Sequence, residues 1–243
     1  MINFKNCIKG LNMQEPCLTF LKNELETSYS FGLVRDLFSL PCMQYETKHK
    51  LSMIFALLED REINDTIIDW LTQILSNITA DLWASCEVRL STYIESNHFM
   101  LSRSQLMLLA NTIEVMYAKG FNTYKLLNLI YQRLSLSDVE FNPDSDDNVR
   151  IKLAKIAYST SKFNICDSLA TIENVKHHLK VSEHKHLLGM LNYYKGLCLE
   201  VASYSLEFKD SKHYILKSRN KGFALASIYL NYRGNNVETS KKS

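Results

Sequence analysis

The sequence predicts an all-α protein of about eleven helices in antiparallel hairpins, arranged as an α-solenoid-like stack or as an irregular helical bundle. The 243 residues include only 7 Gly and 3 Pro. This content is low against average usage, and turn-dense β-sandwiches or glycine-looped α/β enzymes need more turn residues. Apolar residues recur at helical spacing through most of the chain, and no segment shows the apolar–polar alternation of a half-buried strand.

Residues 1–135 are expected to form an N-terminal region of helical hairpins. Pro16 suits the first turn of a helix because its φ angle is already fixed near the helical value, and a second helix is expected to end before Pro41. The seven helices of this region are expected at residues 17–29, 31–40, 46–60, 66–78, 80–96, 103–119 and 124–134.

Capping residues support several of these boundaries. Ser102 and Gln105 have the spacing of a capping box, in which each side chain bonds the backbone amide of the other residue. Gly120 is expected to end the same helix, because glycine adopts the left-handed conformation at little cost. Asn64 or Asp65 is expected to cap the helix at 66–78, and Asn122 or Thr123 the helix at 124–134.

The second half begins with an acidic loop at residues 136–147, which contains Pro143 and lacks apolar periodicity. Asp146, Asp147 and Asn148 are expected to cap a helix at 149–161, and Asn164 the helix that follows it. Two longer helices are expected at 183–208 and at about 211–232, the second with a bend at Gly222. The C-terminal helical region covers 148–232, and residues 233–243 are expected to be a disordered tail. The regions together are expected to form one continuous domain.

The sequence predicts that a helical hairpin occurs more than once. When residues 109–130 are shifted by 42 positions onto 151–172, four residue types coincide, including the Phe-Asn pair at the corner. The Gly-Phe corner and following leucines of residues 102–134 resemble the helix pairs of heptatricopeptide-type repeats, and residues 193–208 resemble the first helix of a tetratricopeptide unit. This resemblance implies a curved helical scaffold that binds RNA or a protein along its concave face. It assigns no functional residue in this chain.

The charge is unevenly distributed. The chain carries a net charge of +2, but residues 209–243 contain eight Lys and Arg against two acids, so residues 1–208 carry −4. A basic end on an acidic body favours an anionic partner. The alternative is a solvated last helix followed by a polar tail. The residues expected to bind a partner or a nucleic acid are Lys209, Lys212, Lys217, Arg219, Lys221 and Arg233.

Catalytic and metal-binding patterns are not evident in the sequence. His177, His178, His184 and His186 lie within ten residues, but their spacing predicts a polar corner between two helices, and no metal or cofactor is expected. The six cysteines are scattered without a C-x-x-C pair, as in proteins of a reducing compartment. No G-x-S-x-G, H-E-x-x-H or phosphate-binding loop occurs, so an enzyme is not expected.

The sequence therefore predicts a non-enzymatic helical scaffold or adaptor that binds a protein partner. One alternative is a helical-repeat RNA-binding or ribonucleoprotein component that uses the basic C-terminal helices. Another is an enzyme or ligand-binding helical domain whose site is assembled from distant residues. A cytoplasmic location is expected, with mitochondria as the alternative because Lys5 and Lys9 precede the first acid. No apolar run approaches the roughly 20 residues of a membrane span. The sequence does not predict the oligomeric state.

Overall fold

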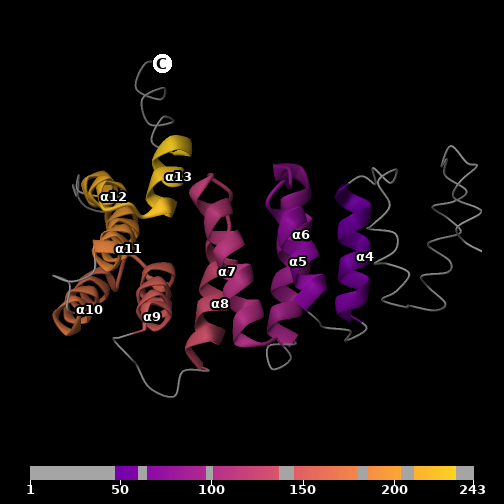
Figure 1. Ribbon diagram of the computed structural model, residues 1–243, viewed down its shortest axis with the longest axis horizontal. Helices are drawn as coiled ribbons and strands as arrows, with labels where there is room; N and C mark the ends of the chain where they lie inside the picture. Colours follow the sequence, from indigo (N-terminus) through magenta and orange to yellow (C-terminus); the bar gives the residue numbers. More distant parts are fainter. Residues whose placement is uncertain are drawn as a thin grey trace, which may run out of the picture. The chain divides into compact units, whose positions relative to one another are not determined.

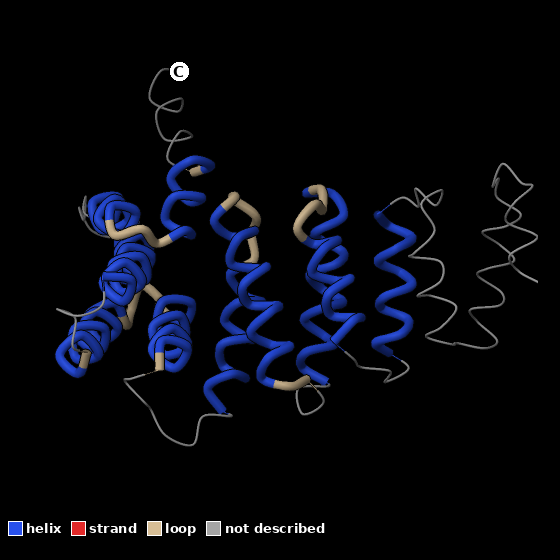
Figure 2. The backbone as a smooth tube through the Cα atoms, in the orientation of Figure 1, coloured by secondary structure: helices blue, strands red, loops and turns tan. Residues whose placement is uncertain are grey.

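The computed structural model describes residues 47–59, 65–96, 101–136, 145–179, 185–203 and 211–233, in which the regular structure is entirely α-helical (Figure 2). The all-α class is thereby confirmed, with ten helices among these residues. The expected helices at 17–29 and 31–40 and the tail at 234–243 lie outside the described residues. By its contacts the chain divides into two units, Met1–Glu62 and Ile63–Ser243, a boundary well before the acidic loop.

The first unit is described through helix α4, Thr47–Glu59, which buries Leu51, Ile54, Phe55 and Leu58. The second unit contains nine described helices: α5 Asp65–Leu75, α6 Ala80–Ser96, α7 Arg103–Ala118, α8 Tyr124–Leu136, α9 Asp146–Ser159, α10 Ile165–His178, α11 Lys185–Ser203, α12 Ser211–Asn220 and α13 Ala224–Tyr232. Among the described residues, no helix has both the length and the apolar character needed to cross a membrane.

Within the second unit most helices pack against neighbours in the chain. α7 packs against α5 and α8, and α9 packs against α8, α10 and α11. The last helix is different, because α13 returns to pack against α7 (Figure 1). In a solenoid each repeat contacts only the repeats next to it. The contact between α7 and α13 joins segments more than 100 residues apart and departs from that plan.

The same tripeptide, Lys-Gly-Phe, ends two helices in the same way. Gly120 has a φ of 103° and Gly222 a φ of 86°. The amide of Phe121 donates to the carbonyl of Met116 after α7, and the amide of Phe223 donates to Ser218 after α12. These bonds define Schellman motifs, which need the left-handed conformation at the glycine. The expected single helix at 211–232 is therefore two helices, because the motif at Gly222 ends α12 and turns the chain.

Other helix boundaries confirm or correct the expected caps. The capping box of Ser102 and Gln105 is present in both directions. Helix α9 begins earlier than expected, since Ser145 is its N-cap and accepts a bond from the amide of Asn148. Asp146 and Asp147 therefore lie in the first turn and are not the cap.

Two further expected caps differ in detail. Asn164 occupies the N-cap position of α10, but its side chain accepts a bond from the amide of Ser161 and none from α10. The carbonyl of Thr123 accepts a bond in the first turn of α8, while its hydroxyl donates back to the Ile113 carbonyl of α7 at 3.4 Å.

Helices α11 and α12 approach closely because α11 presents two glycines to α12. Gly189 and Gly196 are seven residues apart and thus lie on one face of α11. A Cβ atom at Gly196 would lie 2.6 Å from Cγ1 of Ile215 and 3.1 Å from the carbonyl oxygen of Ser211. At Gly189 the Ser218 hydroxyl donates to the backbone carbonyl at 2.6 Å. The pair is antiparallel, since the later residue of α12 meets the earlier glycine of α11.

We predict that Gly196→Ala destabilises the protein by about 1–3 kcal/mol, because the added methyl group overpacks the contact with Ile215. In an unconstrained helix the same change would stabilise by about 1 kcal/mol, so the sign of the effect is diagnostic. The measurement is the free energy of unfolding in urea, followed by circular dichroism.

Two variants control this measurement. Asn174→Ala, at an exposed position of α10, should leave stability unchanged or slightly raised. In an Ile215→Ala background the cost of Gly196→Ala should shrink, because the clashing atom has been removed. An undiminished cost in that background would show that Ile215 is not the cause.

Candidate functional site

A fully buried carboxylate lies where three helices of the second unit meet. Glu114 of α7 has no exposed surface. Its carboxylate pairs with the Arg150 guanidinium of α9 and accepts a bond from the Tyr194 hydroxyl of α11 at 2.7 Å. The Tyr158 hydroxyl of α9 donates to the same oxygen as Tyr194, at 3.2 Å. Burying a charge is costly unless the charged group is paired and hydrogen-bonded. The Glu114 carboxylate meets this condition through its three donors.

Aromatic rings surround this ion pair. The Tyr131 ring stacks on Tyr158 with centroids 5.8 Å apart and an interplanar angle of 11°. The rings of Tyr117 and Tyr194 contact Tyr158 edge-on, at 5.6 and 6.3 Å. Burial and the negative charge of Glu114 raise the pKa values of Tyr131, Tyr158 and Tyr194 well above the usual range. These hydroxyls therefore remain protonated and able to donate.

Arg150 connects the buried carboxylate to the molecular surface. Its side chain is 18% exposed, whereas that of Glu114 is 0% exposed. Burial alone lowers the pKa of Arg150, but the charge of Glu114 together with Tyr194 and Tyr131 outweighs it, and the net shift is upward. The guanidinium is thus a permanent cation, and the buried Glu114 carboxylate balances its charge.

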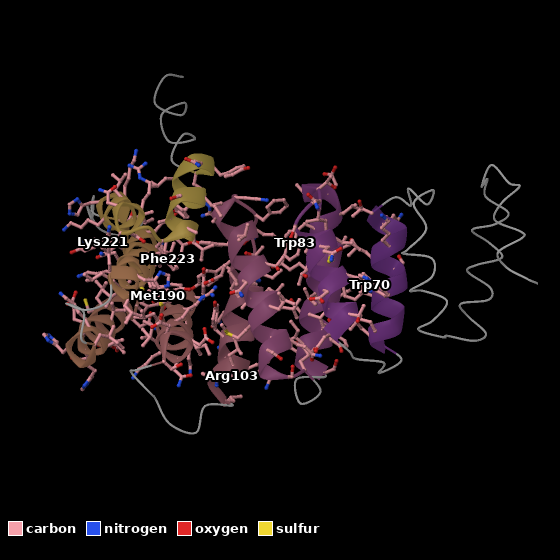
Figure 3. All side chains as sticks on the ribbon, in the orientation of Figure 1. Trp70, Trp83, Arg103, Met190, Lys221 and Phe223 are labelled. Carbon is pink, nitrogen blue, oxygen red and sulfur yellow. The ribbon has the colours of Figure 1, made fainter. Side chains whose placement is uncertain are left out.

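A cleft of about 510 Å³ opens beside Arg150. Its apolar wall consists of Val115, Met190, Phe223, Leu225 and Ile228, from α7, α11 and the segment from Phe223 into α13. Met190 and Phe223 are labelled in Figure 3, one on α11 and the other just before α13. Phe223 is placed there by the Schellman motif at Gly222, and its ring lies 5.4 Å from that of Tyr193. The return of α13 to α7 therefore closes this side of the cleft.

The polar residues of the cleft come from three helices. They are Asn111 of α7, Asp146, Asp147 and Arg150 of α9, and His186 of α11. Asp146 and Asp147 are exposed in the first turn of α9, where the helix dipole favours negative charge. The ring of His186 lies 5.7 Å from that of Phe223. The cleft thus combines an apolar wall with a polar side that carries the exposed carboxylates of Asp146 and Asp147.

The basic residues predicted to bind a partner lie in different environments in the structure. Lys209 lies outside the described residues. Lys212, Lys217, Arg219 and Lys221 are exposed on or directly after α12. Arg233 is different: its guanidinium carbon lies 4.2 Å from the centre of the Tyr117 ring and its Nη1 3.8 Å from Glu200. Arg233 therefore packs the end of α13 against α7 and α11.

The histidines of the sequence cluster are also separated. His177 and His178 are exposed in the last turn of α10, His184 lies outside the described residues, and His186 borders the cleft. Among the described residues, no three His, Cys, Asp or Glu side chains gather in a way that could hold a metal ion.

Sequence reasoning missed the central pair of this site. Glu114 and Arg150 are 36 residues apart and neither belongs to a recognisable motif. One signal was available, because Glu114 follows Ala110 and Ile113 on a predominantly apolar helix. A carboxylate on a core-facing stripe requires a buried partner.

The neighbouring tyrosines of α11 allow a matched test of this network. The Tyr194 hydroxyl bonds Glu114, whereas the buried Tyr193 hydroxyl has no hydrogen-bond partner among the described residues. We expect Tyr194→Phe to lower the free energy of unfolding by about 1.5–3 kcal/mol, because it removes a hydrogen bond to a charged group. Tyr193→Phe should cost close to nothing. Urea titration of both variants is the measurement, and equal losses would contradict the role assigned to Glu114.

The chain was also compared with known proteins. No model of a known protein family, no curated protein sequence and no solved structure matches it significantly. The function of the chain is therefore inferred from the cleft and the charged surfaces of its second unit.

Proposed function

We propose that the protein is a non-enzymatic helical scaffold that binds a short segment of a partner protein in the cleft beside Arg150. The observation that carries the proposal is the cleft itself. Its volume of about 510 Å³ lies within the roughly 300–1,000 Å³ of ligand pockets, and it joins an apolar wall to a few polar groups. Apolar surface provides binding energy, and polar groups orient the bound segment.

The contacts that hold the lining residues also support binding of a partner segment. Arg150 is held by Glu114, and Phe223 is held among the rings of Tyr193 and Tyr194. A site whose side chains are already ordered loses less conformational entropy on binding. The cleft therefore suits a short segment that adapts to a fixed surface.

The two buried cysteines among the described residues, Cys86 and Cys198, give little support to covalent catalysis. Burial raises the pKa of the Cys86 thiol to about 12 and that of Cys198 to about 11. A thiol must ionise to act as a nucleophile, so these two are unreactive at neutral pH. Neither lines the cleft.

The test of the proposal is Ala224→Arg, which places a long side chain in the cleft. Ala224 is an exposed lining residue at the start of α13, so the substitution should leave the fold intact. The tagged full-length chain is used for affinity purification from its native source, with and without ribonuclease, and bound proteins are identified by mass spectrometry. Proteins retained after ribonuclease treatment should decrease at least tenfold on the variant.

Ala170→Arg is the matched control, since Ala170 is equally an exposed helical alanine but lies on α10, which does not line the cleft. It should retain the same proteins as the unchanged chain. Equal retention by both variants would mean that the cleft is not the binding site.

The alternative function, RNA binding, is favoured by a separate observation on α12. Lys212, Lys217, Arg219 and Lys221 are exposed within ten residues, and none is paired with a described carboxylate. The Tyr214 ring contacts two lysines, since the amino group of Lys195 lies 4.6 Å and that of Lys217 lies 5.5 Å from its centre. Lys195 is also paired with Glu173. Cations that neutralise phosphates beside an aromatic ring are typical of surfaces that bind single-stranded RNA.

Replacing Lys217, Arg219 and Lys221 with Ala tests this alternative. If RNA binds here, the affinity for a single-stranded RNA should fall at least tenfold. The slope of log affinity against log salt should decrease by about 2, because three phosphate contacts are lost. Fluorescence anisotropy over a salt series is the measurement. The matched control replaces three exposed lysines outside α12 with Ala: Lys125 of α8, Lys155 of α9 and Lys162 of the turn before α10. The same loss in both triple variants would exclude a site on α12.

A further inference from the structure

The cleft beside Arg150 has a net negative charge. Of the residues that line it, Asp146 and Asp147 are acidic and Arg150 is basic. The positive charge of Arg150 is compensated by Glu114, which lies behind it and is fully buried. An incoming ligand therefore meets two carboxylates whose charge is not balanced within the cleft.

No described side chain neutralises these two carboxylates through an ion pair. Arg103 of α7 reaches this turn of α9, where it donates to the side chain of Asn148 at 2.5 Å. Successive helical residues are about 100° apart, so Asn148 points about 200° away from Asp146, whereas Arg150 points within about 40° of it. Arg103 thus reaches a face of α9 well away from Asp146, and it does not line the cleft.

The other titratable and charged groups near the cleft do not change this balance. His186 borders the cleft on α11, and Lys221 precedes the lining residue Gly222 but does not line the cleft itself. The acids and the cations therefore lie on different sides: the carboxylates on the α9 side and the exposed cations on the α12 side.

We infer that the segment bound by the cleft is basic and apolar: an apolar side chain lies against Met190, Phe223 and Ile228, and an adjacent Lys or Arg faces Asp146 and Asp147. This inference rests on the proposed function and adds the chemical class of the partner segment. An acidic segment would face two carboxylates of like charge, and an uncharged one would gain nothing from them. Like-charge contacts discriminate strongly against the wrong partner.

The experiment selects peptides from a phage-displayed library of random 12-residue sequences on the immobilised full-length chain. Parallel selections use Ala224→Arg, which obstructs the cleft, and Ala170→Arg, which does not. Peptides enriched on the unchanged chain and on Ala170→Arg, but lost on Ala224→Arg, should carry Lys or Arg beside Leu, Ile, Phe or Met. The best of them is then synthesised and its affinity measured by fluorescence anisotropy.

The double variant Asp146→Asn, Asp147→Asn should weaken binding of that peptide at least tenfold. The exposed acids Asp69 and Asp81 of α5 and α6 provide the matched control, and replacing both with Asn should leave the affinity unchanged. Circular dichroism and the thermal midpoint show whether each variant is folded.

The outcomes separate the two levels of the proposal. Cleft-dependent peptides that are acidic or uncharged, or a basic peptide whose affinity does not change when Asp146 and Asp147 are replaced, would overturn this inference and leave the proposed function standing. If no enriched peptide is sensitive to Ala224→Arg, both the inference and the peptide-binding function of the cleft are wrong.

Discussion

The buried carboxylate of Glu114 is the constraint on which the second unit depends. An isolated charge inside a protein is too costly to maintain, so two other helices must bring donors to the carboxylate on α7. Arg150 and Tyr158 come from α9 and Tyr194 from α11. Because each donor is tied to its own helix, the network sets how far α7, α9 and α11 can shift relative to one another. Removing one partner of such a pair costs far more than the pair contributes in net stability.

The cleft is a consequence of that arrangement and of one turn. The ion pair holds Arg150 at the surface of α9, and the motif at Gly222 directs α13 back to α7. Arg233 then packs against the Tyr117 ring, and Tyr229 donates to Glu200 at 2.5 Å, which holds α13 in place. A straight continuation of α12 would leave Met190 and the Arg150 side of α9 without an opposing wall. Stability and the candidate site thus depend on the same contacts.

The two proposed surfaces differ in whether the sequence alone specifies them. The exposed cations of α12 were identified from the sequence, because a run of Lys and Arg without acids is visible there. The structure separates Arg233 from this group and assigns it a packing contact. The cleft could not be identified in the same way, since its residues come from four separate segments of the chain. A site assembled from distant residues without a motif is recognisable only once those residues are adjacent.

The sequence by itself determined the local structure of this protein. Apolar spacing predicted the helices, and the capping box of Ser102 and the glycine at 120 predicted two boundaries, because these signals act within a few residues. The same local signal, Lys-Gly-Phe, occurs at Gly222, where the sequence predicts a bend and the structure has a helix end. Only the tertiary structure decided that Glu114 meets Arg150, that α13 returns to α7 and that a cleft forms between them. Those outcomes depend on how side chains from distant segments pack and share charge, and apolar periodicity along a helix does not specify which partner its buried face will meet.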